Sequence, residues 1–457
     1  MLDSQTLSRP SARPGTLQLP RAWTALLALT FLGNAAAIIW LWVHGGNLHP
    51  HSTGDLLTGI GRLTGLLGAY LALVQVVLLA RLRVLERLVG FDRLTVWHRW
   101  NGHVCIDLVL AHVVFTVWGY SLVDKYPLGK ELSTMLGGGI YPGMITATIA
   151  TGLFIAVVAT SLVIVRRRLR YEWWYCVHLL AYAAIALSWF HEIPTGNELV
   201  LDRVAADYWR GLYLATIAVL LIWRVAMPLA RAWRYRLRVA EVTQEAPGVV
   251  SLRITGRRLD RMGAHAGQFF LWRFLTRHAW GTAHPFSLSA APEGDSLRIT
   301  VKGLGDHSAR AGQIPVGTRV MAEGPFGVFT DERRRREKAV LIAGGIGITP
   351  IRALLETMQG DLIVLYRALT EADVIFREEL DAFAGSGGAV VHYLIGDHLG
   401  EGRELLAPKH LLELVPDLIE RDVFLCGPPA MAAFILENVR MARVPRRQIH
   451  AERFALI

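Results

Sequence analysis

Four histidines lie within apolar stretches that are long enough to form membrane-spanning helices. His98 and His112 lie in one stretch, and His178 and His191 lie in another. A histidine inside a membrane span is costly and tends to mark a functional site. Neutral imidazole is the usual axial ligand of haem iron. The two similarly spaced pairs therefore predict two haem groups, each held between the same two helices, and electron transfer as the chemistry.

The spacing within each pair predicts how the helices present these side chains. The fourteen-residue step from His98 to His112 corresponds to roughly 21 Å along a helix and returns to within ~40° of the same face. The thirteen-residue step from His178 to His191 rotates by roughly 220°, which suits a straight helix less well. The second helix should therefore be bent, overwound or underwound, or should bind the two haems from different angles.

An arginine in another apolar stretch is a second unusual residue. Arg62 follows Gly59-Ile60-Gly61 and should lie at the level of the outer pair of histidines. A cation buried in a membrane needs a partner, and a haem propionate is the expected one. A functional alternative is that Arg62 also attracts an anionic oxygen species at the edge of the outer haem.

Six apolar stretches must position these residues. Each can supply the ~20 residues that cross ~30 Å of hydrocarbon. After Met227-Pro228 the apolar runs become short and alternating, which is typical of strands in a soluble domain. The stretches cover approximately residues 23–43, 54–80, 98–122, 143–165, 174–195 and 209–230.

Part of the formal net charge of +10 reflects membrane topology. Arginines gather before the first stretch, in the second and fourth connections, and after the last stretch. The positive-inside rule then places both termini in the cytoplasm, and no nucleic-acid partner is implied. The residues around Ala35-Ala36-Ala37 resemble a signal peptide, but an even number of spans favours a retained helix. The three cysteines show no spacing typical of a disulfide framework or a zinc site.

Residues 235–335 are predicted to be rich in strands. Strands over Tyr235–Val242 and Val249–Thr255 flank a turn, and His284-Pro285-Phe286-Ser287 follows. A glycine-rich turn from Lys302 to Ser308 comes next. These segments supply an aromatic ring, a hydroxyl group, a cation and turn amides, the groups that a bound flavin needs.

Residues 339–457 alternate strands with helices. A short strand ends at Gly344-Gly345-Ile346-Gly347-Ile348-Thr349-Pro350, and such a turn lets backbone amides approach a dinucleotide pyrophosphate. Arg367 ends the next strand and favours NADPH, because arginine accommodates a 2′-phosphate. Cys426 precedes Gly427-Pro428 and either places the nicotinamide or is a small buried residue at a strand end. The run Arg333–Arg336 is predicted to be a solvated linker between the two domains.

In this order the motifs resemble the NADPH oxidase and ferric reductase family. The resemblance covers residues from about 22 to 457. It implies a membrane all-α six-helix bundle, then a β-barrel FAD domain and an α/β nucleotide-binding domain of the ferredoxin-NADP reductase type. The expected limits are 1–21 for a cytoplasmic tail, 22–230 for the dihaem domain, 235–335 for the FAD domain and 336–457 for the NAD(P)H domain. The size is similar to that of minimal bacterial members, which implies the bacterial-type plasma (inner) membrane.

The resemblance also implies roles for individual residues. His98 and His178 would bind the inner haem, and His112 and His191 the outer haem. Phe286 would lie against the isoalloxazine ring of FAD and Ser287 near its N5 atom. The remaining contacts implied are His284, Pro285, Lys302 and Ser308 with FAD, Gly344, Gly345, Gly347, Thr349, Pro350, Arg367, Cys426, Gly427 and Pro428 with the dinucleotide, and Phe454 as the shield of the flavin face.

Two departures from the family pattern bear on the terminal acceptor. Three residues follow Phe454, so the terminal carboxylate is displaced. Animal superoxide-producing members carry a histidine one turn beyond the outer ligand, where this chain has Thr116. Arg62 matches the arginine that those members carry on the second span. The oxygen-reducing interpretation therefore has one of its two usual marks.

The resemblance implies a transmembrane NADPH oxidase that moves electrons from NADPH through FAD and two haem b groups to O2 and forms superoxide. NADH remains possible as donor, and no obligatory protein partner is evident. One alternative is a ferric-chelate or cupric reductase with the same electron path. Another is a cytochrome b-type subunit that supplies a partner protein or quinone. A non-redox transporter with a nucleotide-sensing domain is the remaining one.

Overall fold

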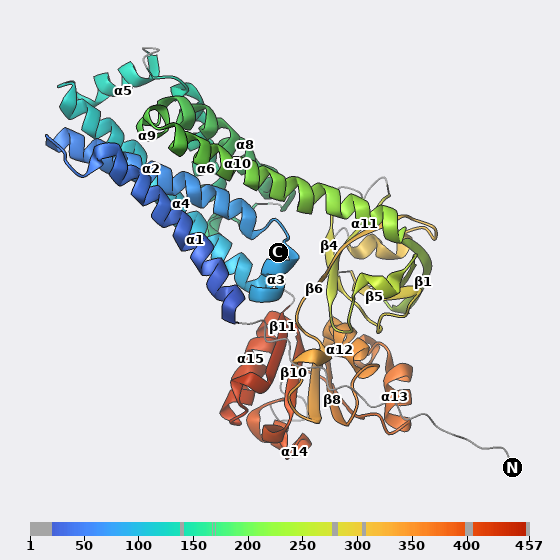
Figure 1. Ribbon diagram of the computed structural model, residues 1–457. Helices are drawn as coiled ribbons and strands as arrows, with labels where there is room; N and C mark the ends of the chain where they lie inside the picture. Colours follow the sequence, from blue (N-terminus) through green and yellow to red (C-terminus); the bar gives the residue numbers. More distant parts are fainter. Residues whose placement is uncertain are drawn as a thin grey trace. The chain divides into compact units, whose positions relative to one another are not determined.

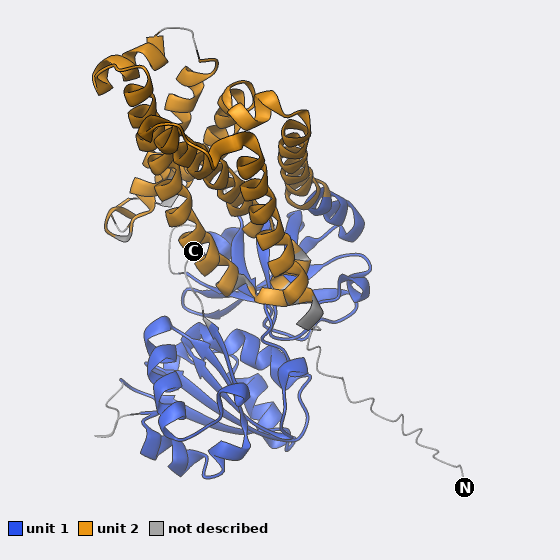
Figure 2. Cartoon of the chain, turned by 60° about the vertical axis from the view of Figure 1, so that its left-hand side comes forward, with its two compact units in different colours: residues 1–18, 227–457 blue, residues 19–226 orange. Residues whose placement is uncertain are grey.

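The computed structural model describes residues 21–137, 141–166, 168–169, 171–276, 282–303, 308–397 and 405–453. The chain divides into two compact units (Figure 2), a helical one over residues 19–226 and one that contains the strands and continues from residue 227. Phe454, most of the expected cytoplasmic tail and residues 304–307 of the predicted flavin turn lie outside the described residues.

The helical unit begins with α1 and ends with a π-helical turn (Figure 1). Short side-chain caps start two of its helices, since Ser52 accepts a hydrogen bond from the backbone N–H of Asp55, and Asp202 accepts from that of Val204. The helices are α1 Arg21–Trp42, η1 Val43–Asn47, α2 Thr53–Leu78, α3 Arg83–Val89, α4 Phe91–Val123, α5 Leu128–Gly137, α6 Met144–Ser161, α7 Val163–Arg166, α8 Tyr171–Thr195, α9 Asn197–Leu201, α10 Arg203–Leu220 and η2 Leu221–Ala226.

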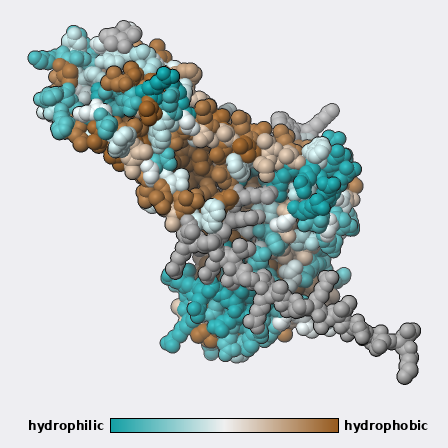
Figure 3. All heavy atoms as spheres, in the orientation of Figure 1, coloured by the Kyte–Doolittle hydropathy of each residue, from teal (hydrophilic) through white to brown (hydrophobic). Residues whose placement is uncertain are grey.

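Within the described residues, six helical segments are long and apolar enough to cross a membrane, as the sequence predicts. They cover residues 25–47, 53–78, 93–123, 144–161, 173–195 and 203–235. Large apolar side chains such as Leu29, Ile145 and Leu214 are exposed on this unit, and Figure 3 shows hydrophobic residues gathered over it. An exposed apolar surface of this kind fits lipid. The protein is therefore a multi-pass membrane protein.

The sixth span is longer than the sequence predicts. It continues through η2 and α11 (Met227–Tyr235), so Tyr235 ends a helix and the predicted strand over Tyr235–Val242 begins later, at Arg238. Pro228 lacks a backbone N–H and its ring crowds the carbonyl four residues earlier. The wider π-helical turn directly before Pro228 accommodates the proline without ending the helix.

Two three-stranded antiparallel sheets share one hydrophobic core in the first part of the second unit. Their orders are β1-β2-β5 and β4-β3-β6, and isolated bridges from Arg238 to Arg319 and from Leu288 to Ile299 connect them. Phe270, Trp272 and Leu252 are fully buried in this core. The strands are β1 Arg238–Ala246, β2 Val249–Thr255, β3 Phe269–Phe274, β4 His284–Ser287, β5 Ser296–Lys302 and β6 Val320–Phe326, with 3₁₀ turns η3 Leu259–Met262 and η4 Ser308–Gln313.

A five-stranded parallel sheet forms the rest of this unit, as expected for an α/β nucleotide-binding domain. Its order is β11-β10-β7-β8-β9, and apolar clusters cover both of its faces. The strands are β7 Lys338–Gly344, β8 Asp361–Ala368, β9 Val390–Ile395, β10 Asp422–Gly427 and β11 Ile449–Arg453, the helices are α12 Ile348–Leu355, α13 Arg377–Gly385, α14 Pro408–Leu414 and α15 Pro429–Met441, and the 3₁₀ turns are η5 Asp331–Arg333, η6 Gly345–Gly347, η7 Glu371–Asp373, η9 Leu418–Glu420 and η10 Arg446–Gln448.

Candidate functional site

The four predicted histidines form two facing pairs between α4 and α8. The ring centroids of His98 and His178 lie 6.0 Å apart, and those of His112 and His191 lie 6.4 Å apart. A metal ion bound by two imidazoles lies about 2.0 Å from one nitrogen of each ring. Each of these nitrogens lies about 1.1 Å from the centre of its own ring. The two ring centroids must therefore be about 6.2 Å apart. Both pairs therefore have the separation that one shared metal ion needs.

Hydrogen bonds at Nδ1 orient three of these rings. His98 Nδ1 lies 3.2 Å from the carbonyl oxygen of Gln75, and His112 Nδ1 lies 2.7 Å from that of Gly61. Because a carbonyl oxygen only accepts hydrogen bonds, Nδ1 carries the proton in both rings. Nε2 then keeps its lone pair for a metal, as is usual for ligating histidines.

His178 is oriented by a serine of the neighbouring span. Its Nδ1 lies 3.3 Å from the hydroxyl oxygen of Ser161, which donates its single proton to the carbonyl of Val157. Ser161 must therefore accept the hydrogen bond from His178, and it also accepts one from the indole of Trp174. Nδ1 of His191 is buried and has no hydrogen-bond partner among the residues that the structure describes.

Paired rather than clustered ligands fit haem. The described ranges contain no group of three or more histidine, cysteine, aspartate or glutamate side chains that could hold a metal ion. A bare zinc ion usually takes three or four protein ligands. A haem group supplies four nitrogens of its own and needs only the two axial ligands that each pair provides.

α2 approaches α4 closely, and the lack of a side chain at Gly65 leaves room for the ring of His112. A Cβ atom added to Gly65 would lie 2.6 Å from Nδ1 of His112. Small residues at such positions allow close packing of membrane helices. The glycine in α2 therefore sets the space that the outer histidine occupies.

The structure narrows the three explanations offered for the thirteen-residue step in α8. This helix is α-helical throughout Tyr171–Thr195, and its proline, Pro194, lies in the last turn. No overwound or underwound segment interrupts it between His178 and His191. Bending of the helix, or binding from different angles, remains as the means by which both histidines face α4.

Arg62 belongs to a polar network at one end of the helical unit. Its guanidinium donates to Oδ1 of Asn47 at 3.3 Å, and the amide nitrogen of Asn47 donates to Oε1 of Glu198 at 2.8 Å. Glu198 is buried, with 5% of its surface exposed. The structure thus gives Arg62 a neutral amide as its protein partner. No motif in the sequence points to Asn47 or Glu198.

Three further polar side chains near the histidines are not indicated by any motif. Asn101 donates to the side-chain oxygen of Gln75, whose amide nitrogen donates to the carbonyl of His98. Glu192, next to His191, accepts hydrogen bonds from the indole of Trp209 and the hydroxyl of Tyr213. A polar side chain inside a predicted span is the signal that could have identified Gln75, Asn101 and Glu192.

Four of the predicted flavin residues form one short strand, β4. β4 consists of His284, Pro285, Phe286 and Ser287, and the rings of His284 and Phe286 lie 6.0 Å apart at 27° to each other. The indole of Trp272 donates to the carbonyl of Phe286, and Ser287 is buried. β4 thus holds an aromatic ring and a hydroxyl group at adjacent positions.

The two residues predicted to bind the FAD phosphates lie close in sequence but have different surroundings. Lys302 ends β5, and its ammonium lies 3.2 Å from Oδ1 of Asp373 in the nucleotide-binding domain. Hydrogen bonds from Thr370 and Lys302 lower the pKa of Asp373. Ser308 is the first residue of η4. A phosphate at Lys302 would therefore compete with Asp373.

The predicted dinucleotide motifs meet at the point where the strand order of the parallel sheet reverses. Gly344 ends β7 and Gly427 ends β10, which are neighbouring strands. A Cβ atom on Gly347 would lie 2.3 Å from the carbonyl oxygen of Cys426, so only glycine fits there. Ligands of open α/β sheets bind in the crevice at the carboxyl ends of such strands.

Cys426, Thr349 and Arg367 lie around the same strand ends. Cys426 is fully buried, and burial together with the charge of Glu452 raises the pKa of its thiol. Burial of this kind is typical of structural rather than reactive cysteines. Thr349 and Pro350 are buried in α12, and Arg367 lies beside Gly344 in the register of β8 with β7 and donates to the carbonyl of Leu394.

Comparison with known proteins finds a related family for each half of the chain. Residues 64–189 match the family described as ferric reductase like transmembrane component, and residues 341–437 match the oxidoreductase NAD-binding domain. The chain is 30% identical to ferredoxin–NADP reductase B of Sorangium cellulosum over 37% of its own length and 77% of that relative. It is 28% identical to the NADH oxidoreductase HCR of Escherichia coli, over 46% of this chain and 66% of that protein.

A longer match joins the two halves. The chain is 25% identical to dual oxidase 2 of Rattus norvegicus over 60% of its own length and over 19% of that much longer protein. Residues 227–457 make up a smaller share of the chain than this, so the match extends into the helical unit. Together, the ferric reductase-like membrane helices, the ferredoxin-NADP reductase-like module and this match make the chain an NAD(P)H-dependent transmembrane oxidoreductase that uses FAD. It belongs to the NADPH oxidase and ferric reductase family.

Proposed function

We propose that this protein is a transmembrane NADPH oxidase that delivers electrons from cytoplasmic NADPH to O2 at the outer face and forms superoxide. Its cofactors would be FAD and two haem b groups, and it would lie in the plasma membrane with both termini in the cytoplasm. The observation that supports this most directly is the presence of two histidine pairs, with ring centroids 6.0 and 6.4 Å apart, at two levels of one helical unit.

The order of the two pairs supports an electron path across the membrane. His98 pairs with His178 and His112 with His191, so α4 and α8 run in the same direction. The two pairs are about 20 Å apart along the helices. When bound, FAD would accept hydride and release single electrons, and the haem irons would carry them one at a time.

The residues of the chain would bind, orient and tune these groups. His98 and His178 would hold the inner haem, and His112 and His191 the outer haem. His284, Phe286 and Ser287 would contact the flavin ring, and the segments around Gly344, Gly347 and Gly427 would receive the dinucleotide. Arg62, whose protein partner is the neutral Asn47, would retain its positive charge for an anionic group at the outer haem.

Two other acceptors fit the same interior. A ferric-chelate reductase would use the same electron path with a different molecule at the outer face, and Thr116 in place of the usual histidine favours it. An electron-supplying cytochrome subunit would turn over slowly until a partner protein or quinone was added.

The haem ligands can be tested by variants of the outer pair. We expect His112→Ala or His191→Ala to halve the haem content of the purified protein and to stop electron transfer to external acceptors, while NADPH still reduces FAD. His103→Ala is a matched control, because His103 is an exposed histidine on the same helix. Absorption spectra and acceptor reduction measure both effects. Full haem content or undiminished transfer in the outer-pair variants would disprove the proposed ligation.

The acceptor can be identified in one spectroscopic experiment. The detergent-purified protein with FAD is reduced by NADPH under nitrogen and then exposed to air. Haem bands that reoxidise rapidly with release of superoxide support the oxidase. Bands that persist in air until a ferric chelate is added support the reductase instead.

A further inference from the structure

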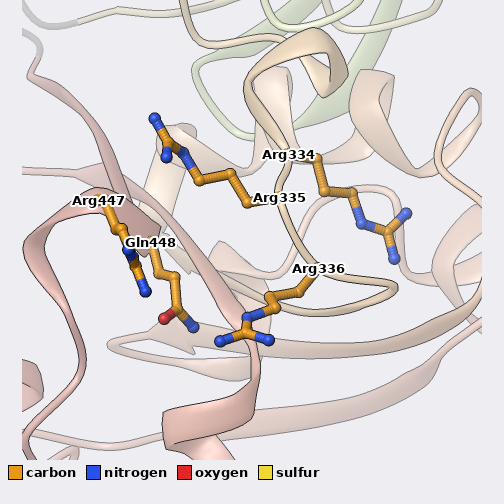
Figure 4. Close-up of a pocket in the computed structure, with 5 residues that line it drawn as sticks. All are labelled: Arg334, Arg335, Arg336, Arg447 and Gln448. Atoms are coloured by element: carbon orange, nitrogen blue, oxygen red, sulfur yellow. The ribbon is translucent and has the colours of Figure 1, made fainter. Parts of the chain in front are cut away.

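A pocket lined by arginines lies in the nucleotide-binding domain, away from the predicted dinucleotide crevice. It has a volume of about 420 Å³ and is lined by Arg334, Arg335, Arg336, Arg447 and Gln448 (Figure 4). The first three residues lie between η5 and β7, and the last two lie in η10, directly before β11. Both segments precede strands of the parallel sheet. The pocket therefore lies at the amino ends of the strands, whereas the dinucleotide motifs follow their carboxyl ends.

The backbone of this pocket is fixed by a buried carboxylate. Asp422 begins β10, the strand between β11 and β7, and none of its surface is exposed. Its Oδ2 accepts hydrogen bonds from the backbone N–H groups of Arg335 and Arg336, both at 2.6 Å, and its Oδ1 lies 3.2 Å from Nε2 of His450. The two arginine side chains thus extend from a backbone that is held in place before any ligand binds.

Gln448 is equally well held. Its amide nitrogen donates to the carbonyls of Ile419 and Arg421, and 1% of its surface is exposed. Its Oε1 is buried and has no hydrogen-bond partner within the described part of the chain. Figure 4 shows Arg336 and Arg447 extending toward Gln448, while Arg334 extends away.

Within the described residues, no acid forms an ion pair with the exposed guanidinium groups of the pocket, and the one carboxylate beneath it, Asp422, accepts its hydrogen bonds from backbone N–H groups. Arg335, Arg336 and Arg447 are exposed, and the described residues form no ion pair with them. Arg334 donates to the carbonyls of Glu337 and Gln359, which are neutral acceptors. The carboxylates of Asp361, Asp417 and Glu420 are already paired with Arg421 or Lys338.

We propose that this pocket binds a small anion that carries two or more phosphate groups. The planar guanidinium group binds phosphate through two parallel hydrogen bonds. Arg336 and Arg447 come from two segments and extend toward the same side of the pocket (Figure 4), so each can hold one phosphate group. The volume lies within the ~300–1,000 Å³ range of small-molecule sites. Free polyphosphates and a diphosphate lipid headgroup share this chemistry.

Binding is tested on the full-length protein in detergent, saturated with NADP⁺ so that the dinucleotide crevice is occupied. Inorganic tripolyphosphate is titrated by calorimetry, and phosphatidylcholine vesicles with and without cardiolipin are tested by co-sedimentation. We expect binding to the wild-type protein, and a loss of at least about tenfold in affinity in Arg336→Gln/Arg447→Gln. Arg336→Lys should lose less, because it keeps the charge. Arg257→Gln, which changes an exposed arginine elsewhere in the same unit, should bind normally.

Each result separates the possible ligands. Binding of tripolyphosphate supports a soluble ligand, and binding of the cardiolipin vesicles alone supports a lipid headgroup. Unchanged affinity in the double variant, loss of binding when NADP⁺ is present, or absence of binding to both probes would overturn the proposal. Tighter binding of a polyglutamate peptide than of tripolyphosphate would overturn it in favour of an acidic protein surface. Unaltered NADP⁺ affinity in the variants shows that they are folded.

Discussion

At the level of single residues, the groups proposed to hold cofactors are themselves held by neighbours. Carbonyl oxygens of Gln75 and Gly61 receive the Nδ1 protons of His98 and His112, and Ser161 does the same for His178. Such contacts orient a ligand and raise its basicity. We propose that the choice of nicotinamide cofactor depends on one side chain, Arg367, which lies beside Gly344 in the strand register and would meet a 2′-phosphate.

Replacement of Arg367 tests this cofactor preference. We expect Arg367→Ala to raise KM for NADPH by about tenfold or more, since a charge-assisted hydrogen bond contributes about 1.5–3 kcal/mol. KM for NADH should change little, because NADH has no 2′-phosphate. Steady-state FAD reduction with both donors measures the ratio. Equal changes with both donors would show that Arg367 has a structural role, through its hydrogen bond to Leu394.

At the level of elements, the outer histidine depends on how closely two helices approach. α2 lies against α4 through residues without large side chains, and Gly65 faces His112 directly. Membrane helices associate through such close contacts because lipid provides no hydrophobic force between them. A single added methyl group at this contact would therefore act on the haem site without changing any ligand.

We expect Gly65→Ala to displace the ring of His112 and to lower the content of the outer haem. The added Cβ would lie 2.6 Å from Nδ1 of His112, closer than any van der Waals contact. Gly33→Ala on α1 is the matched control, because a Cβ there has no atom within 4 Å. Haem content and the spectrum of each variant measure the effect. A normal spectrum in Gly65→Ala would show that α2 can move without loss of the site.

At the level of the whole molecule, each unit is held together by its own kind of interaction. Apolar helices form the helical unit, and side-chain hydrogen bonds such as those of Glu198 and Glu192 connect them. In the nucleotide-binding domain, ion pairs hold the ends of strands. Arg421 is nearly buried and pairs with Asp361 and Asp417, and Asp417 also pairs with Lys338 at the start of β7. These bonds connect the amino ends of β7 and β8 with η9.

This network makes the stability of the nucleotide-binding domain depend on pH. Hydrogen bonds from Arg421 and Lys338 lower the pKa of Asp417 to about 2. Because the folded-state pKa lies below the unfolded value of about 3.9, the stabilisation is complete above about pH 4 and is lost as the pH falls toward about 2. We expect Asp417→Asn to lower the unfolding midpoint by a few degrees near pH 7, because each kcal/mol of lost unfolding free energy lowers the midpoint by about 2–4 °C.

The difference in unfolding midpoint between Asp417→Asn and the wild type should shrink between about pH 4 and about pH 2, because the wild-type carboxylate loses its charge there. Thermal unfolding of the full-length protein in detergent measures it. Glu420→Gln is the control, because Glu420 is exposed and makes one of the two ion pairs of Lys338. An Asp417→Asn effect that is constant with pH would contradict the ion-pair explanation.

The sequence alone is sufficient to predict the features that depend on local physical chemistry. The length and apolarity of the six spans follow from the thickness of hydrocarbon and the rise of a helix, and the structure has the six helices. Val249–Thr255 has the bounds predicted for it, because a turn and an alternating pattern define a strand locally. The end of the sixth span was predicted too early, because Pro228 is accommodated within the helix.

Only the tertiary structure decided which distant residues meet. Asn47 and Glu198 are separated by 151 positions, and Lys302 and Asp373 by 71, yet each pair is joined by a hydrogen bond. The run Arg333–Arg336 was interpreted as a solvated linker, and only the parallel sheet brings Arg447 to the same pocket. Contacts of this kind depend on strand order and helix packing, which no local pattern of residues encodes.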